Sequence, residues 1–176
     1  NTAGQVTSTP NRISITVNKE NFTHDMIMES GKFNISILSE KASFDTFKHF
    51  GFQSGKTVDK FEGYSAAKRS ENGIYYITEG TNAYISASVE QTIDLGTHTM
   101  FIAAVDDMEV LADEPSASYA YYQSSIKPQP EAKASQGKTA WRCTVCGYIY
   151  VGEELPADFI CPLCKHPASD FEKVTV

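Results

Sequence analysis

The chain has few cysteines, one tryptophan, no long hydrophobic run and fewer basic than acidic residues, and these shortages exclude several classes of protein. All four cysteines lie between positions 143 and 164, which argues against a secreted scaffold held together by disulfides. No apolar run approaches the length of a membrane span. The net charge of −7 gives no general electrostatic reason to bind nucleic acid, because such binding requires clustered Lys and Arg.

The length and composition predict a globular chain with one medium and one very small domain. The 176 residues are 41% hydrophobic and 21% charged, which is ordinary for a folded protein. The sequence begins at Asn1 without a methionine or a charged and apolar leader, so it shows no signal peptide. We therefore expect a reducing, cytoplasmic location.

Several segments have the pattern of antiparallel strands. Apolar and polar residues alternate over residues 12–19 and again over 33–37, as in half-buried strands. Between residues 74 and 111, three β-rich runs are separated by Gly80 and Gly96. Many strands joined by short turns predict a mainly β fold, an antiparallel barrel rather than a doubly wound α/β sheet.

Two short helices are expected between these strands. The first would have Thr23 as its N-cap, Asp25 in its first turn and Gly31 at its end. The second is predicted within residues 43–51, where Ser precedes an aromatic-rich segment closed by Gly.

A linker separates the two expected domains. The segment from Ser124 to Gly137 is rich in Pro, Ser and Lys and has no periodicity. The predicted organisation is a larger domain over 1–127, a linker over 128–138 and a small domain over 139–176.

The four cysteines form two CxxC pairs with a spacing typical of a metal site. Cys143 and Cys146 make the first pair, and Cys161 and Cys164 follow after fourteen residues. This spacing lets two tight loops face each other across one metal, and four thiolates in a tetrahedron select iron or zinc. Zinc would serve only to hold a small domain together.

Aromatic residues around the ligands favour iron, because a dry shell tunes a redox potential; they are Trp141, Tyr148, Tyr150, Phe159 and Phe171. The stretch WRCTVCGYIYVGEELPADFICPLCKHPASDFEKV resembles a rubredoxin, in the shorter form also fused to rubrerythrins. The resemblance implies one mononuclear iron bound by the four cysteines and carrying a single electron. So small a domain also needs its metal in order to fold.

The larger domain contains polar segments suited to an organic cofactor. Residues 1–10 are small and hydroxyl-bearing, although an ordinary polar loop is the simpler interpretation. In residues 18–23 a lysine and an expected helix N-terminus come together, as an anion site requires. Residues 49–56 add glycines, a hydroxyl and another cation.

The stretches QVTSTPNRISITVNKENFTHDMI, ESGKFNISILSE, HFGFQSGKTVDKF and DLGTHTMFIAAV resemble the flavin reductase-like family of FMN-binding split barrels, over residues 1–127. The resemblance implies a homodimer with FMN near the subunit interface. Family members usually begin with about two strands before the Asn-Thr segment; these are missing here, which would leave an open barrel edge.

The resemblance also implies which residues contact FMN. Those along the isoalloxazine and ribityl chain would be Asn1, Thr2, Gln5, Val6, Thr7 and Ser8; those at or near the phosphate, Lys19, Asn21, Phe22 and Thr23; and those of a closing segment, Ser54, Gly55 and Lys56. His98 stands where the family has a histidine close to the flavin, as a candidate catalytic residue, although a histidine at a strand end is more often structural.

Together the two resemblances imply an electron relay from NAD(P)H through FMN to iron, and on to a partner such as a flavo-diiron oxygen or nitric oxide reductase. Two other functions remain open. The chain could be a passive carrier reduced by a separate reductase, or a flavin reductase with a structural zinc ribbon.

Overall fold

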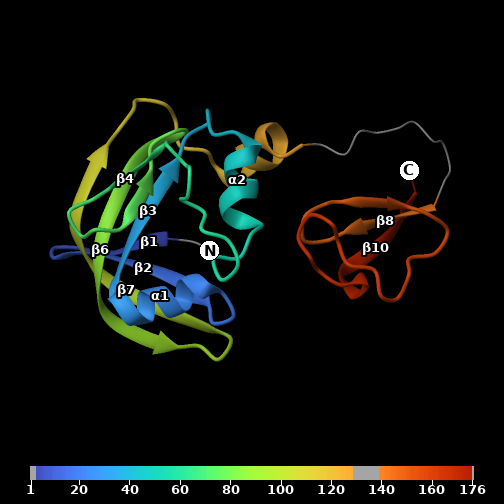
Figure 1. Ribbon diagram of the computed structural model, residues 1–176, viewed down its shortest axis with the longest axis horizontal. Helices are drawn as coiled ribbons and strands as arrows, with labels where there is room; N and C mark the ends of the chain where they lie inside the picture. The colour runs from blue at the N-terminus through green and yellow to red at the C-terminus, as the bar shows by residue number, and fades with distance from the viewer. Residues whose placement is uncertain (1–2, 129–138, 176) are drawn as a thin grey trace. The chain divides into compact units, whose positions relative to one another are not determined.

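The computed structural model describes residues 3–128 and 139–175, and these divide into two compact units, one ending at Ile126 and one beginning at Lys127. Asn1, Thr2 and most of the expected linker lie outside the described residues. Each unit can be followed separately in Figure 1.

The larger unit is built around a curved antiparallel sheet of five strands. In spatial order these are β1 (Ala3–Ser8), β2 (Asn11–Asn18), β7 (His98–Val110), β6 (Thr81–Asp94) and β3 (Lys32–Leu38). A separate hairpin consists of β4 (Ala67–Arg69) and β5 (Tyr75–Ile77). The expected mainly β, antiparallel fold is confirmed.

The core of this unit lies on one face of the sheet. Ile13 and Val17, four residues apart on β2, are both buried, as strand periodicity requires. They pack in one cluster with Phe33 of β3 and with Phe101 and Ala103 of β7, which are both fully buried. Burying a Phe side chain contributes about 1.5–3 kcal/mol, so this cluster fixes the sheet against which the candidate site is built.

Strand β1 corrects the interpretation of residues 1–10 as a polar loop. It pairs with β2 from Ala3↔Ile15 to Ser8↔Asn11, with a register shift between Gln5 and Thr7. All six of its residues are exposed, so it lacks the buried face that produces an alternating sequence pattern. It forms one edge of the sheet.

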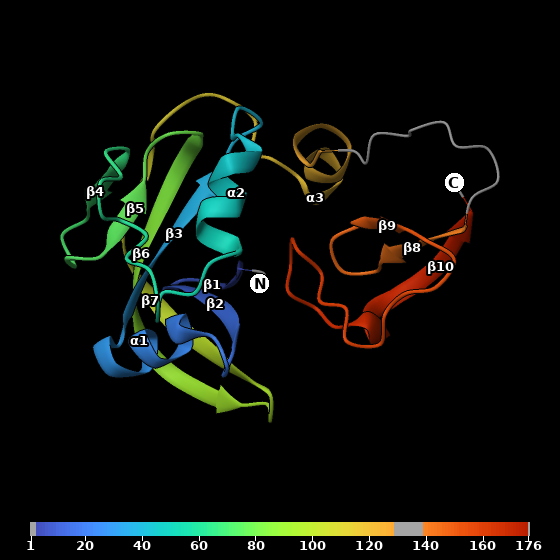
Figure 2. The same ribbon diagram turned by 45° about the vertical axis from the view of Figure 1, so that its right-hand side comes forward.

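Helix α1 (Phe22–Ser30) connects β2 to β3, and its N-cap is Asn21 rather than the predicted Thr23. Gly31 ends it in the left-handed conformation with a φ of 66°, and its N–H donates to the carbonyl oxygen of Ile27. Ile27 is the residue of α1 that is buried in the core. Figure 2 shows α1 near the turn between β6 and β7, where the backbone N–H of Lys19 donates to the Thr97 carbonyl oxygen.

Helix α2 (Phe44–Gly51) begins and ends where the sequence predicts. The Ser43 side chain accepts a hydrogen bond from the backbone N–H of Thr46. A short α3 (Tyr119–Tyr121) continues as a π-helix over Tyr122–Ile126, and Tyr122 packs on Phe47 of α2 with ring centroids 4.6 Å apart. Among the described residues, no helix has both the length and the apolar character needed to cross a bilayer.

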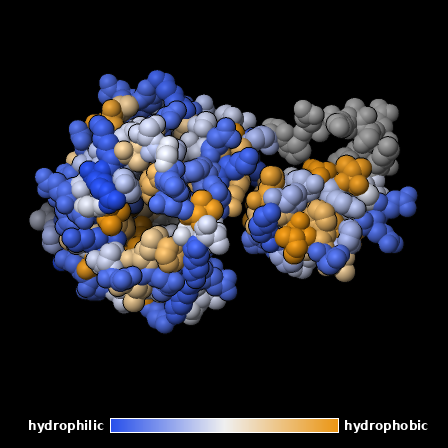
Figure 3. Space-filling model, in the orientation of Figure 1, coloured by the Kyte–Doolittle hydropathy of each residue, from blue (hydrophilic) through white to orange (hydrophobic). Residues whose placement is uncertain are grey.

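The smaller unit has a three-stranded antiparallel sheet in the order β10-β8-β9. Its strands are β8 (Thr139–Cys143), β9 (Ile149–Val151) and β10 (Phe171–Thr175), and a 3₁₀ turn over Ala168–Asp170 precedes the last. Its buried core contains Phe171 and three of the four cysteines. Apolar residues also reach its surface, as the orange patches in Figure 3 show.

Candidate functional site

The four cysteine sulfurs converge on one point in the smaller unit. Their Sγ atoms all lie within 4.8 Å of one another. Two edges of the cluster, Cys143 to Cys164 and Cys146 to Cys161, measure 3.6 Å and 3.4 Å. A tetrahedral metal with bonds of about 2.3 Å places its sulfurs about 3.8 Å apart. The donor set therefore fits a single tetrathiolate metal ion.

Two loops of matching geometry present these sulfurs. In the first, the Cys143 N–H donates to the Tyr148 carbonyl oxygen and the Gly147 N–H donates back to that of Cys143. The second loop repeats both bonds, from Cys161 to His166 and from Lys165 to Cys161. The repeated CxxC sequence thus folds twice into the same tight turn.

Backbone N–H groups also point at the sulfurs. Although burial opposes it, hydrogen bonds from the N–H groups of Cys164 and Leu163 lower the pKa of Cys161 to about 7. Burial raises the pKa of Cys146 and of Cys164, and hydrogen bonds from the Tyr148 N–H to Cys146 and from the His166 N–H to Cys164 oppose that rise. Such bonds stabilise anionic sulfur and tune the potential of a bound metal.

The cluster is covered on one side and accessible on another. Phe159 packs between Tyr150 and Phe171, with ring centroids 4.9 and 5.4 Å away. Cys164 is the partly exposed ligand, and the apolar residues Val145 and Leu163 beside the ligands are 51% and 38% exposed. One edge of the sulfur cluster therefore reaches an apolar surface patch.

In the larger unit, the first turn of α1 is open to an anion. Within the described residues, the Asn21 side chain makes no capping hydrogen bond, so the N–H group of Thr23, at the second position of the helix, lacks the partner that an N-cap side chain supplies. Helix N-termini of this kind bind phosphate. The expected residues Asn21, Phe22 and Thr23 are thus placed together at the start of one helix.

Both candidate cations lie near this turn, and each has a carboxylate partner. Lys19 Nζ is 2.7 Å from Asp94 Oδ1, at the end of β6. Lys56 Nζ is 3.7 Å from Asp25 Oδ2, in the first turn of α1. Sequence reasoning gave neither aspartate a role at this site, and no local pattern links Lys19 to a residue 75 positions later.

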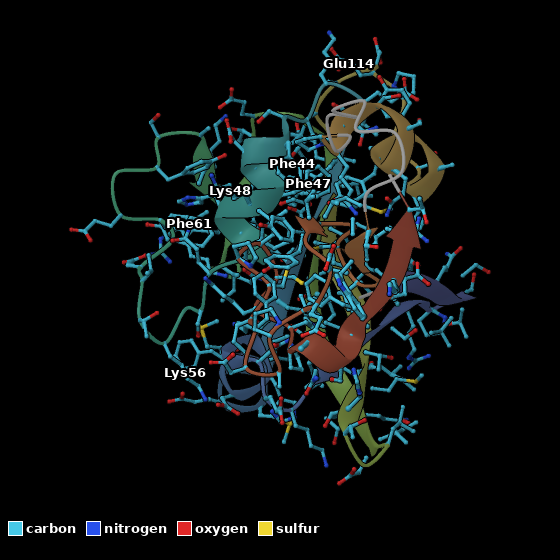
Figure 4. All side chains as sticks on the ribbon, turned by 90° about the vertical axis from the view of Figure 1, so that its right-hand side faces the viewer. Phe44, Phe47, Lys48, Lys56, Phe61 and Glu114 are labelled. Atoms are coloured by element: carbon cyan, nitrogen blue, oxygen red, sulfur yellow. The ribbon has the colours of Figure 1, made fainter. Side chains whose placement is uncertain are left out.

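The closing segment reaches α1 through a close backbone contact. A Cβ added at Gly55 would lie 3.0 Å from Cδ1 of Phe22, so the segment passes directly over that ring. Figure 4 shows Lys56 on the loop that follows α2, at the periphery of the larger unit. Ser54, Gly55 and Lys56 are therefore brought to the same helix start as Phe22.

One histidine begins β7, and a second, on α1, contacts the same end of that strand. His98 is half-buried, and its Nδ1 lies 2.9 Å from Oγ1 of Thr97. His24 of α1 lies 2.9 Å through Nε2 from Oγ1 of the buried Thr99, and 3.2 Å through Nδ1 from Asp25. His24 thus joins α1 to the strand that carries His98, and sequence reasoning missed Thr99.

The candidate residues of β1 form a separate group. The side-chain amide of Gln5 donates to Oδ1 of Asn11, and the Thr7 hydroxyl donates to the Pro10 carbonyl oxygen. Val6 and Ser8 are exposed. Within the described ranges, no hydrogen bond joins these four residues to α1.

A polar depression of about 450 Å³ contains none of the expected FMN-contacting residues. It is lined by Ser43, Asp45, Thr46, Lys48, His49, Gln53, Tyr64 and Glu79.

Comparison with known proteins finds two family matches, one in each part of the chain. The flavin reductase like domain family matches residues 1–129, and the rubrerythrin, rubredoxin-like domain family matches residues 141–172. A high molecular weight rubredoxin from Moorella thermoacetica is 35% identical over 99% of this chain and 87% of its own. A ferric-chelate reductase (NAD(P)H) from Archaeoglobus fulgidus is 38% identical over 69% of this chain and 72% of its own.

A solved FMN-binding protein from Thermus thermophilus, with bound 1-cyclohex-2-enone, has a TM-score of 0.55 at 21% identity over 62% of this chain. This chain spans 59% of the length of that structure, and the likeness shows the fold. Fold and site together define a flavin reductase-like barrel joined to a tetrathiolate domain. The chain belongs to the flavin reductase-like family, in the two-domain form of the high molecular weight rubredoxins.

Proposed function

We propose that the chain is an NAD(P)H-dependent oxidoreductase that passes electrons through FMN to a mononuclear iron held by its four cysteines. The observation that carries this proposal is the presence, in one chain, of a flavin reductase-like barrel and a four-sulfur site. FMN accepts two electrons from a nicotinamide and releases them singly, as a one-electron iron centre requires. The ferric-chelate reductase relative supports the choice of NAD(P)H as donor.

The four cysteines would hold the iron, and the surrounding chain would set its properties. N–H groups of Leu163, Cys164, Tyr148 and His166 favour the thiolate forms. Phe159 and its neighbours keep water from one side, and the exposed patch around Val145 and Leu163 gives a partner access to Cys164. This patch is our candidate surface for electron exit to a redox protein, for which a flavo-diiron reductase is the expected type.

For FMN, the start of α1 would hold the phosphate. The N–H groups of Phe22 and Thr23 suit an anion, and Lys19 and Lys56 supply positive charge. The segment from Ser54 to Lys56 would close over the cofactor, and the polar edge strand β1, with the preceding Asn1 and Thr2, would contact the ribityl chain and ring. His98 would orient the nicotinamide or stabilise reduced flavin from the end of β7.

Self-association and location complete the proposal. An edge strand whose six residues are all exposed is suited to being covered by another chain, which supports the expected homodimer. The need for thiolates and reduced nicotinamide supports a cytoplasmic location. We place the domain limits at residues 127 and 139.

The test is an anaerobic titration of the metal-analysed protein with NADH and with NADPH, following the flavin and ferric-thiolate absorbance bands separately. We expect both bands to bleach, with one of the two nucleotides preferred. Bleaching by dithionite but by neither nucleotide would show a passive carrier that needs a separate reductase. A zinc-loaded protein that lacks the ferric-thiolate band, and whose flavin band bleaches with a nucleotide, would show a flavin reductase with a zinc ribbon.

A further inference from the structure

Lys19 is held at the candidate phosphate site by two independent contacts from the β6–β7 turn. Its backbone N–H donates to the Thr97 carbonyl oxygen at 3.0 Å, and its Nζ lies 2.7 Å from Asp94 Oδ1. The side chain of Lys19 is 36% exposed and that of Asp94 is 72% exposed. The ammonium group is therefore fixed, accessible and already paired with an anion.

Asp94 is held in place by the same turn. Its Oδ1 also accepts a hydrogen bond from the Gly96 N–H at 2.8 Å, and Gly96 has a left-handed φ of 81°. The hydrogen bond from Lys19 and that from Gly96 keep the pKa of Asp94 below its ordinary value. Asp94 is thus a permanent negative charge at neutral pH, and its position does not depend on Lys19 alone.

A second lysine–aspartate pair lies at the first turn of α1. Lys56 lies 3.7 Å from Asp25, which also faces Nδ1 of His24. Each cation offered to a phosphate is therefore neutralised by a carboxylate. A phosphate that approaches either lysine also approaches an aspartate, and like charges at such distances repel through solvent.

We propose that Asp94 sets how strongly the chain selects phosphate-bearing flavin, by competing with the phosphate for Lys19. The inference rests on the proposed FMN site. Asp94 acts as a resident counter-ion, and binding of the cofactor exchanges it for the phosphate. Asp25 plays the same role, more weakly, for Lys56. Riboflavin, which lacks the phosphate, should be indifferent to both aspartates.

The test compares FMN with riboflavin as probes for the full-length, metal-loaded protein after removal of its flavin. Asp94→Asn removes the charge but keeps an oxygen that can accept from the Gly96 N–H, so the turn is preserved. Asp113→Asn, at an exposed aspartate of the same unit, is the matched control for net charge. Lys19→Gln, alone and combined with Asp94→Asn, tests whether the effect acts through Lys19.

We expect Asp94→Asn to tighten FMN binding about three- to tenfold at low salt, with a smaller gain at high salt. The riboflavin affinity of Asp94→Asn and the FMN affinity of Asp113→Asn should equal those of the unmodified protein. The gain in FMN affinity should vanish in the Lys19→Gln background. Weaker FMN binding by Asp94→Asn, or an equal change for both flavins, would overturn this inference alone. Failure of the unmodified protein to bind FMN would overturn the proposed flavin site as well.

Discussion

Gly147 and Lys165 occupy the same position in the two cysteine loops, and both have a left-handed backbone, with φ of 78° and 63°. Each donates its N–H to the carbonyl oxygen of the cysteine four residues earlier. Glycine adopts this conformation without steric cost, whereas a residue with a side chain is strained in it by about 1–2 kcal/mol. The second loop therefore contains backbone strain that the first avoids.

Replacing Lys165 with glycine should stabilise the smaller unit by about 1 kcal/mol. Relief of strain outweighs the larger chain entropy of glycine in the unfolded state. The measurement is the temperature at which the iron-loaded protein loses its ferric-thiolate absorbance on slow heating. Lys165→Ala is the control, because it removes the same side chain and keeps the strain. Equal gains from Gly and Ala would trace the effect to the lysine side chain instead.

Removal of the metal should unfold the smaller unit and leave the larger one folded. Three of the four metal ligands, Cys143, Cys146 and Cys161, lie in the buried cluster of the smaller unit together with Phe171, so the metal site is part of its core. Without the metal, the few remaining apolar contacts cannot offset the entropy of ordering the chain.

Hydrogen exchange before and after treatment with a strong chelator measures this outcome. Amides of residues 139–175 should lose protection, while those around Phe101 and Phe33 should keep theirs. Retained protection over 139–175 in metal-free protein would show that this unit folds through its aromatic packing.

Local patterns predicted much of this molecule. Alternation of Ile13, Ile15 and Val17 located β2, because one face of that strand is buried in the core. Ser43 and Gly31 marked helix ends through capping chemistry that acts over a few residues. The metal ligands were readable because all four lie within a short, regularly spaced segment.

What the sequence could not show depends on residues that are distant along the chain. The pair Lys19–Asp94 forms because the end of β2 meets the β6–β7 turn, and the pair Lys56–Asp25 forms because the loop after α2 meets α1. Strand β1 was missed because a strand that exposes both faces has no apolar alternation to detect. Asn21 rather than Thr23 stands at the N-cap position of α1, and the sequence could not decide between them because both residue types are suitable N-caps.

The larger unit should lose stability between pH 10 and pH 12 through Tyr84. This buried tyrosine stacks on Tyr76 and donates its O–H to Oδ2 of Asp107 at 2.5 Å. That hydrogen bond, with burial, raises the pKa of Tyr84 from 10.0 to about 12. Because the folded state holds the proton more tightly, the stabilisation is complete below pH 10 and is lost as the pH rises towards 12.

Urea unfolding of the larger unit at pH 8, 10 and 11.5 measures this dependence. The free energy of unfolding of Tyr84→Phe at pH 8 should be about 1 kcal/mol lower than that of the unmodified protein, since the hydrogen bond is lost. It should also fall less between pH 8 and pH 11.5. Tyr119→Phe, at a tyrosine that is 78% exposed, is the control. Parallel declines in Tyr84→Phe and the unmodified protein would assign the alkaline loss to other groups.

The contact between Gly55 and Phe22 should control how well the loop closes over the start of α1. A Cβ at position 55 would meet Cδ1 of Phe22 at 3.0 Å, so Gly55→Ala must displace either the ring or the loop. Displacement moves Lys56 away from Asp25 and from the proposed phosphate position. We expect Gly55→Ala to weaken FMN binding about three- to tenfold, with little change in unfolding temperature, because the loop is exposed.

A double variant separates this contact from a general effect of alanine on the loop. Phe22→Leu removes the ring edge that the new Cβ would meet, so Gly55→Ala should cost less in the Phe22→Leu background than in the unmodified chain. Gly51→Ala is the matched control, because an added Cβ there meets nothing within 4 Å. FMN titration of the four members of the cycle gives the coupling directly. Additive losses would mean that the ring and the loop act separately, and that packing on Phe22 does not position Lys56.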